Sequence, residues 1–215
     1  MTNSSTTHKD KLKKSLLKFF VFIFWLGIWQ VAYIFVASEL LLPSPVHTFR
    51  RLFELAQTGD FWLKSLFSLL RITEGFGLGV LAGILLALLT SVFEPARYFI
   101  SPAMGLVKST PVASFIILAL VWMGKGAVPV FIAFLMVLPV IWSNVSEGIM
   151  QTDKDLLEMA KVFKLSKSKK IGKIYVPAVL PYLFAGATTS LGFAWKAGIA
   201  AEILSLPLKS IGKEL

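Results

Sequence analysis

The side chains of greatest chemical interest in this chain of 215 residues are two charges inside a long apolar segment, Lys196 and Glu202. If a helix begins near Leu180, they stand ~24 Å and ~33 Å along its axis. A charge at such a place is costly and usually functional when the segment crosses a membrane. Two roles are open: a gate or attractive site for an anionic solute near one membrane boundary, or snorkelling and pairing with another helix.

A second group of candidate residues lies in the segment 147–177. Thr152-Asp-Lys-Asp155 fits the start signal of a helix. The apolar side chains that follow recur at helical spacing and form one stripe with small and soft residues at its centre, which suits a groove on a partner: Leu156, Met159, Ala160 and Phe163. A lysine-rich piece, 166–173, comes next, and we expect Pro177 to end it. The seven lysines of the segment fit an interfacial helix on anionic lipid equally well.

Several kinds of chemistry are excluded by the residues that are missing. The chain contains no cysteine, and its two histidines, His8 and His47, lie in a tail and a connection. It contains neither a His-Glu-x-x-His pattern nor a Gly-x4-Gly-Lys-Ser/Thr loop that could cradle ATP phosphates. We therefore predict no catalytic residue, no cofactor and no metal site.

The composition is that of a membrane protein. Hydrophobic residues make up 56% of the chain, charged residues 16%, and the mean hydropathy is +0.74; soluble domains are roughly 45–50% apolar and about 25% charged. Because about 20 apolar residues cross a bilayer as a helix, we predict an all-α, polytopic membrane helix bundle with five transmembrane helices. The five apolar runs are 19–37, 75–93, 109–124 (extended back over 102–107, with Lys108 snorkelling), 126–146 and 174–208.

The net charge of +10 is explained by topology rather than by nucleic acid. The N-terminal tail and the second and fourth connections hold 14 Lys and Arg residues, whereas the opposite side holds seven. The excess of positive charge marks the cytoplasmic side. We therefore predict a cytoplasmic N-terminus and a plasma (inner) membrane location in a prokaryote.

Small residues and prolines predict how the helices pack. Gly75, Gly79 and Gly83 form overlapping small-xxx-small steps, which let another helix approach closely. Apolar residues at helical spacing over 49–56 predict a short interfacial helix.

Prolines inside spans leave carbonyl groups to be satisfied by neighbours or by a watery cavity. Such breaks suit a transport path and a structural bundle alike. Pro111 and Asn144 therefore join Lys196 and Glu202 as candidates for a path or gate, although an interhelical hydrogen bond is the first expectation for Asn144.

The segment 147–177 resembles the EAA loop of binding-protein-dependent ABC importer permeases. That loop reads Glu-Ala-Ala, three residues, Gly, nine residues, Ile-x-Leu-Pro, and here Glu158, Ala160, Ile174 and Pro177 match at the right spacing. Met159 replaces the first Ala, Val176 the Leu and Lys164 the Gly, which puts the turn after the helix in doubt. Further segments are similar to the nitrate/sulfonate/taurine-type branch: 42–45, 68–76, 109–113, 122–124, 177–186 and 194–202.

The resemblance implies a type I ABC importer permease, a transport subunit rather than an enzyme, for a small anionic, nitrate-, sulfonate- or taurine-like solute. Its partners would be ABC ATPase subunits, an extracytoplasmic solute-binding protein, a second permease copy in a homodimer and membrane lipid, with no nucleic acid. The residues expected to contact the ATPase are Glu158, Met159, Ala160, Phe163, Lys164 and Pro177.

The resemblance also organises the chain. We expect a basic cytoplasmic tail over 1–18, a permease domain over 19–208 with its coupling loop at 147–177, and a short end over 209–215. The family normally has six spans, and no sixth apolar run follows Leu208.

Two other functions compete with this interpretation. A secondary transporter or channel without an ATPase would need intramembrane carboxylates for ion coupling, and the apolar runs contain only Glu202, near one edge. An intramembrane enzyme would need a catalytic constellation, which the residues do not provide.

Overall fold

The computed structural model describes residues 4–214, with side chains from residue 13 onward. Part of the predicted basic tail, residues 1–3 and the side chains of Lys9 and Lys11, lies outside the described residues, as does Leu215. All the regular elements of the described chain are helices, as predicted. They divide into two compact units, Met1–Phe61 and Trp62–Leu215, which we describe separately.

The first unit contains α1 (Ser4–Val36) and α2 (Pro45–Ala56). Ser44 caps α2, because its hydroxyl accepts a hydrogen bond from the amide of His47 at 3.1 Å, and Pro45 sits in the first turn, where its missing N–H costs nothing. Phe49 and Phe53 are exposed, while Arg50 lies 3.2 Å from Glu54 in an ion pair. The predicted helix over 49–56 is thus confirmed, and it is amphipathic.

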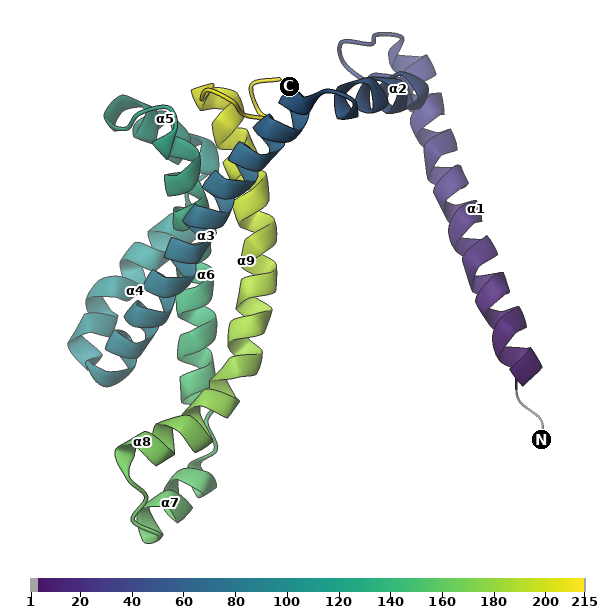
Figure 1. Ribbon diagram of the computed structural model, residues 1–215. Helices are drawn as coiled ribbons and strands as arrows, with labels where there is room; N and C mark the ends of the chain where they lie inside the picture. Colours follow the sequence, from purple (N-terminus) through teal and green to yellow (C-terminus); the bar gives the residue numbers. More distant parts are fainter. Residues whose placement is uncertain (1–3, 215) are drawn as a thin grey trace. The chain divides into compact units, whose positions relative to one another are not determined.

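The second unit is a helical bundle in which the central helix, α6, packs against α3, α4, α5 and α9 (Figure 1). Its elements are α3 (Gly59–Val92, beginning three residues before the unit boundary), α4 (Glu94–Ser109), α5 (Val112–Trp122), α6 (Ala127–Met150), α7 (Lys154–Val162), α8 (Lys167–Lys170), a π-helical turn (Ile171–Tyr175) and α9 (Val176–Ser205).

In the described part of the chain, four helices are long and apolar enough to cross a membrane, and a bent pair makes a fifth if it is counted as one span. The second and third predicted spans need correction. The second helix begins at Gly59 and not near Gly75, so much of the predicted outer connection is helical. The third span is not straight, because α4 and α5 meet at 104°. Thr110 is extended there (ψ 133°), as the residue before a proline prefers.

The glycine stripe of α3 packs directly on α6, as predicted. A Cβ atom on Gly79 would lie 2.7 Å from Cβ of Val137, and one on Gly83 would lie 2.8 Å from Cβ of Ile141. A Cβ atom on Gly75 would overlap the carbonyl oxygen of Val130. Only glycine lets the two backbones come this close, and close packing drives helix association where lipid removes the hydrophobic effect.

The lysine-rich piece does not end at Pro177, contrary to the prediction. Residues Lys167–Ser205 form one helical run of 39 residues, with the π-helical turn directly before Val176. Pro177 cannot donate a backbone hydrogen bond and crowds the preceding turn, and a widened turn there relieves both effects. The helical run of the fifth span therefore begins at Lys167 and not at Ile174, where the apolar run predicted its start.

Candidate functional site

The segment between α6 and α9 forms one end of the second unit (Figure 1). Asp153 caps α7, because its carboxylate accepts a hydrogen bond from the amide of Asp155 at 2.8 Å. The predicted cap, Thr152, is instead buried, and its hydroxyl donates to the carbonyl oxygen of Gly148 on α6. Thr152 thus continues the bonding of α6, and the helix start moves by one residue.

The outer surface of α7 is apolar and uncovered. Leu156, Met159, Val162 and Phe163 are exposed, with Phe163 at 72%, and Glu158 is exposed among them. Ala160 is the exception at 3% exposure, so its side chain packs inside the segment. A surface of this kind in the described chain is typical of a protein contact site.

The turn after α7 is kept although the family's glycine is replaced. Lys164 adopts a left-handed conformation with φ 49°. Its amide bonds to the carbonyl of Lys161 and the amide of Leu165 bonds to that of Ala160, both at 3.0 Å, which is the Schellman pattern. The doubt raised by this replacement is resolved: the turn forms, at a backbone cost of roughly 1–2 kcal/mol for a residue other than glycine.

The opposite end of the bundle holds a buried ion pair. Glu202 on α9 is fully buried, and its Oε1 lies 3.1 Å from Nη1 of Arg71 on α3. Its Oε2 accepts hydrogen bonds from the hydroxyl of Ser68 at 2.6 Å and from the amide of Gly212 at 3.3 Å. Two roles were left open for Glu202, a gate and pairing with another helix. The structure shows the pairing, with Arg71 on α3.

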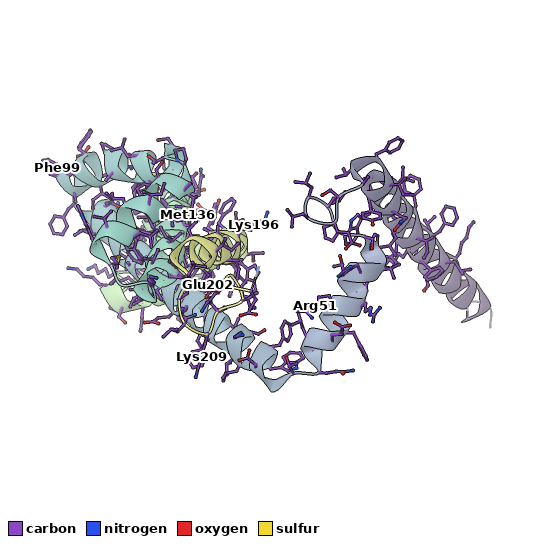
Figure 2. The ribbon with its side chains drawn as sticks, turned by 90° about the horizontal axis from the view of Figure 1, so that it is seen from above. Arg51, Phe99, Met136, Lys196, Glu202 and Lys209 are labelled. Atoms are coloured by element: carbon purple, nitrogen blue, oxygen red, sulfur yellow. The ribbon has the colours of Figure 1, made fainter. Side chains whose placement is uncertain are left out.

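The same cluster fixes the chain that follows α9. Figure 2 labels Glu202 and Lys209 in this region. Arg71 also donates to the carbonyl oxygens of Leu208 at 2.7 Å and Lys209 at 3.2 Å. The hydroxyl of Ser68 accepts from the amide of Ile211, and Lys64 forms an ion pair with Glu214 at 2.8 Å. We call Ser68, Arg71, Glu202 and the segment 206–214 the paired end.

The other predicted path residues are separated in the structure. Lys196 is exposed on α9, although it lies inside the span. Asn144 is half-buried, and its amide donates to the carbonyl of Val140 in its own helix at 2.9 Å, so the predicted interhelical hydrogen bond is wrong. Pro111 lies at the bend between α4 and α5.

Two functional candidates were missed by sequence reasoning. Arg71 was counted as a charge of the outer connection and not as a partner of Glu202, although both were assigned to the same membrane side. Thr189 is exposed on α9 and lies on the same face as Lys196, about two helical turns before it. Between them, Gly192 has nothing within 4 Å of where its Cβ would be. The spacing of seven residues between Thr189 and Lys196 is the sequence signal that could have revealed Thr189.

The described residues contain no group of three or more His, Asp or Glu side chains that could hold a metal ion. Fold and site together define a multi-pass helical membrane protein whose α6–α9 connection carries a short helix with an exposed apolar surface.

Comparison with known proteins gives the family. The model of the binding-protein-dependent transport system inner membrane component matches residues 79–208, more than half of the chain. The chain belongs to this family of ABC importer permeases, in its nitrate/sulfonate branch.

Three relatives illustrate the branch. The chain is 29% identical to the bicarbonate transport system permease CmpB of Synechococcus elongatus, over 95% of this chain and 77% of the relative. It is 28% identical to the nitrate import permease NrtB of the same organism, over 94% and 76%. It is 29% identical to a putative aliphatic sulfonates transport permease, SsuC, of Bacillus subtilis, over 83% and 66%.

Proposed function

We propose that this chain forms the path of an ABC importer for a small anion and that α7 receives the force of a partner ATPase. The observation that carries the proposal is α7 itself: an exposed apolar helix, held at the EAA position between two spans. The chain's own residues provide no ATP-binding loop, so hydrolysis must come from a partner.

The contact with the ATPase is assigned to the exposed surface of α7. Met159 and Phe163 would enter a groove of the partner, and Glu158 would pair with a basic residue at its rim. Ala160 is buried and therefore acts as the packing residue that fixes α7, while Lys164 makes the turn that holds the helix against the next one. Pro177 follows the π-helical turn, where α9 begins, and connects this surface to the span.

The excess of lysine around α7 and α8 supports a cytoplasmic position for this end, together with a cytoplasmic N-terminus. The paired end would then face outward, where a solute-binding protein delivers its cargo. We keep the domain limits and the coupling segment 147–177 as part of this proposal.

The translocation path is assigned to the face of α9 that carries Thr189 and Lys196. A lysine facing lipid at this depth would be expensive, whereas one facing a watery path is tolerated. A single copy leaves this face exposed, which supports a second copy as the other wall of the path. Relatives are named for bicarbonate, nitrate and sulfonates, all of them anions that Lys196 would attract.

Coupling is tested with Glu158→Arg in proteoliposomes that contain the chain and its ATPase. We expect ATP-driven uptake to fall by about tenfold or more, because charge reversal at a contact repels the partner, while insertion and yield stay normal. Glu54→Arg, the same change on α2, is the matched control and should keep its uptake. Unchanged uptake in the Glu158 variant would remove α7 from the coupling assignment.

The path assignment is tested with Lys196→Gln. We expect uptake of the preferred anion, found by competition among bicarbonate, nitrate and taurine, to fall severalfold with ATPase coupling intact, because the attraction is lost. Lys125→Gln, outside the spans, serves as the control. Equal uptake in both variants would contradict a path role for Lys196.

A further inference from the structure

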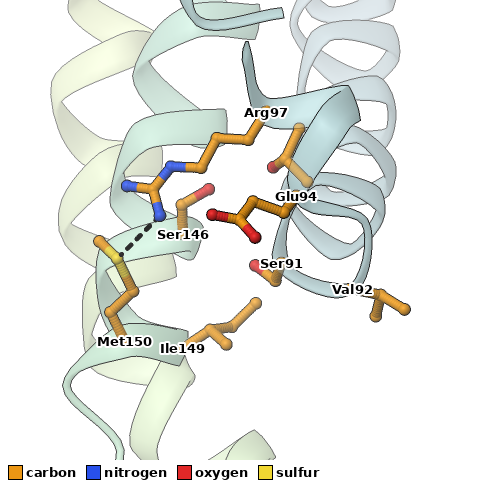
Figure 3. Close-up of a pocket in the computed structure, with 8 residues that line it drawn as sticks. Ser91, Val92, Glu94, Arg97, Ser146, Ile149 and Met150 are labelled. Carbon is orange, nitrogen blue, oxygen red and sulfur yellow. Dashed lines mark hydrogen bonds between the residues drawn. The ribbon is translucent and has the colours of Figure 1, made fainter.

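A polar pocket lies between the C-terminal end of α3, the start of α4 and the C-terminal end of α6 (Figure 3). Its volume is about 300 Å³. The lining is unusual for a membrane bundle because most of it is polar; it consists of Thr90, Ser91, Val92, Glu94, Arg97, Ser146, Ile149 and Met150. None of these side chains belongs to α7 or to the path face of α9.

The pocket contains two opposite charges that do not pair with each other. Within the described chain, Glu94 has no ion-pair or hydrogen-bond partner, and Arg97 makes only a contact of 3.4 Å from Nη1 to the sulfur of Met150. Thioether sulfur is a weak acceptor, so most of the guanidinium N–H groups stay free for a stronger one. Figure 3 shows both side chains directed toward the same space.

A buried hydroxyl lies beside these charges. The Oγ atom of Ser146 is buried and has no hydrogen-bond partner within the part of the chain that the structure describes. Thr90 and Ser91, by contrast, bond to carbonyl groups of their own helix. An unpartnered buried hydroxyl in a native protein calls for a ligand or water, because leaving it unpaired is costly.

The surroundings of the pocket are apolar and lie at a membrane boundary. Val92, Phe93, Tyr98 and Met150 are exposed around it. A second cavity of about 340 Å³ adjoins it, and Glu94 and Arg97 line both. Because α3 and α6 are membrane-crossing helices that end here, on the side of α7, the rim faces the headgroup region of one leaflet.

We propose that this pocket binds a phosphate ester that carries a primary ammonium group, the headgroup of an ethanolamine phospholipid. The lipid lies in the leaflet on the side of α7, which is the inner leaflet in the proposed orientation. The phosphate accepts hydrogen bonds from Arg97, as guanidinium groups prefer. The ammonium donates to the carboxylate of Glu94, and Ser146 donates to a phosphate oxygen. The carboxylate disfavours a purely anionic lipid, and a choline headgroup has no N–H to donate.

Lipid selectivity is measured on the purified chain by native mass spectrometry with phosphatidylethanolamine, phosphatidylcholine and phosphatidylglycerol of identical acyl chains. We expect the ethanolamine lipid to bind about tenfold more tightly than the other two. Arg97→Gln should weaken its binding by about tenfold. Glu94→Gln should abolish the preference over choline while phosphate binding remains, and Arg50→Gln, in the first unit, is the matched control.

Free phosphoethanolamine forms a separate arm that distinguishes a soluble ligand from a lipid. Lipid binding much tighter than that of phosphoethanolamine assigns the site to the membrane, whereas equal affinities assign it to the soluble compound. Three results would overturn the proposal: equal binding of all three lipids, a preference for phosphatidylglycerol, or unchanged binding in both pocket variants. None of these measurements requires an ATPase, so their outcome is independent of the coupling test.

Discussion

Charged side chains are buried and paired at one end of the second unit and exposed at the other. At the paired end, Arg71 and Glu202 are held together away from water, and the chain beyond α9 is bonded to them. At the α7–α8 end, Glu158 and the lysines are exposed and lie beside exposed apolar side chains. Charges of the first kind are paired within the protein that contains them, while charges of the second kind are available to another molecule.

The largest effect is expected at the paired end. Arg71→Met would leave the buried carboxylate of Glu202 without its cation and lower the free energy of unfolding by ~3–5 kcal/mol. Reversible unfolding in mixed SDS micelles measures this loss. Glu158→Met at the other end should change the same quantity by less than about 0.5 kcal/mol, as is typical of exposed sites.

A double variant sharpens this result. Replacing both charges, in Arg71→Met with Glu202→Leu, should be less damaging than Arg71→Met alone, because no unpaired charge remains buried. Arg50→Met breaks an exposed ion pair and should cost only ~0–1 kcal/mol. Similar losses for the Arg71 and Arg50 variants would show that burial does not distinguish the paired end.

The next largest effect is expected at the close contact between α3 and α6, the helices that run between the two ends. Gly79→Ala would place a Cβ atom 2.7 Å from Cβ of Val137 and force α3 away from α6. We expect a loss of ~1–3 kcal/mol in unfolding free energy, as for other overpacked contacts. Gly77, on the same helix, has nothing within 4 Å of the Cβ position, so Gly77→Ala should be neutral or stabilising. A reversed order would argue against this packing.

The smallest effect on stability is expected at the α7–α8 end. Lys164→Gly removes the penalty of a left-handed lysine and should stabilise the turn after α7 by ~1 kcal/mol. Slower hydrogen exchange at the amides of Lys164 and Leu165 would report it. Lys170→Gly, within α8, should do the opposite, because glycine disfavours a helix by ~1 kcal/mol. Faster exchange at the turn in the Lys164 variant would contradict the assignment.

Local patterns predicted much of this structure. Apolar run length located four of the long helices, the glycine spacing predicted the α3 face that meets α6, and the periodicity over 49–56 and 156–163 predicted α2 and α7. These features depend on residues a few positions apart, whose spacing can be read directly. The EAA resemblance pointed to the segment between α6 and α9, where the structure places the short helix α7.

Other features depend on contacts that no local pattern contains. Arg71 and Glu202 lie 131 positions apart, so their pairing follows from how α3 and α9 pack. The bend between α4 and α5 was missed because Pro111 alone does not fix whether a span is kinked or folded back. The helix start at Gly59 was missed because the polar residues of 64–74 interrupt the apolar run while remaining helical.

The long helix α9, Val176–Ser205, has a mechanical consequence. At 1.5 Å per residue its 30 residues extend about 45 Å, so a tilt of about 5° at its foot displaces the far end by about 4 Å. That far end carries Glu202, which is bonded to α3. In the proposed coupling, a push on α7 would act through α9 as a lever arm, and the ion pair would pass the displacement on to α3.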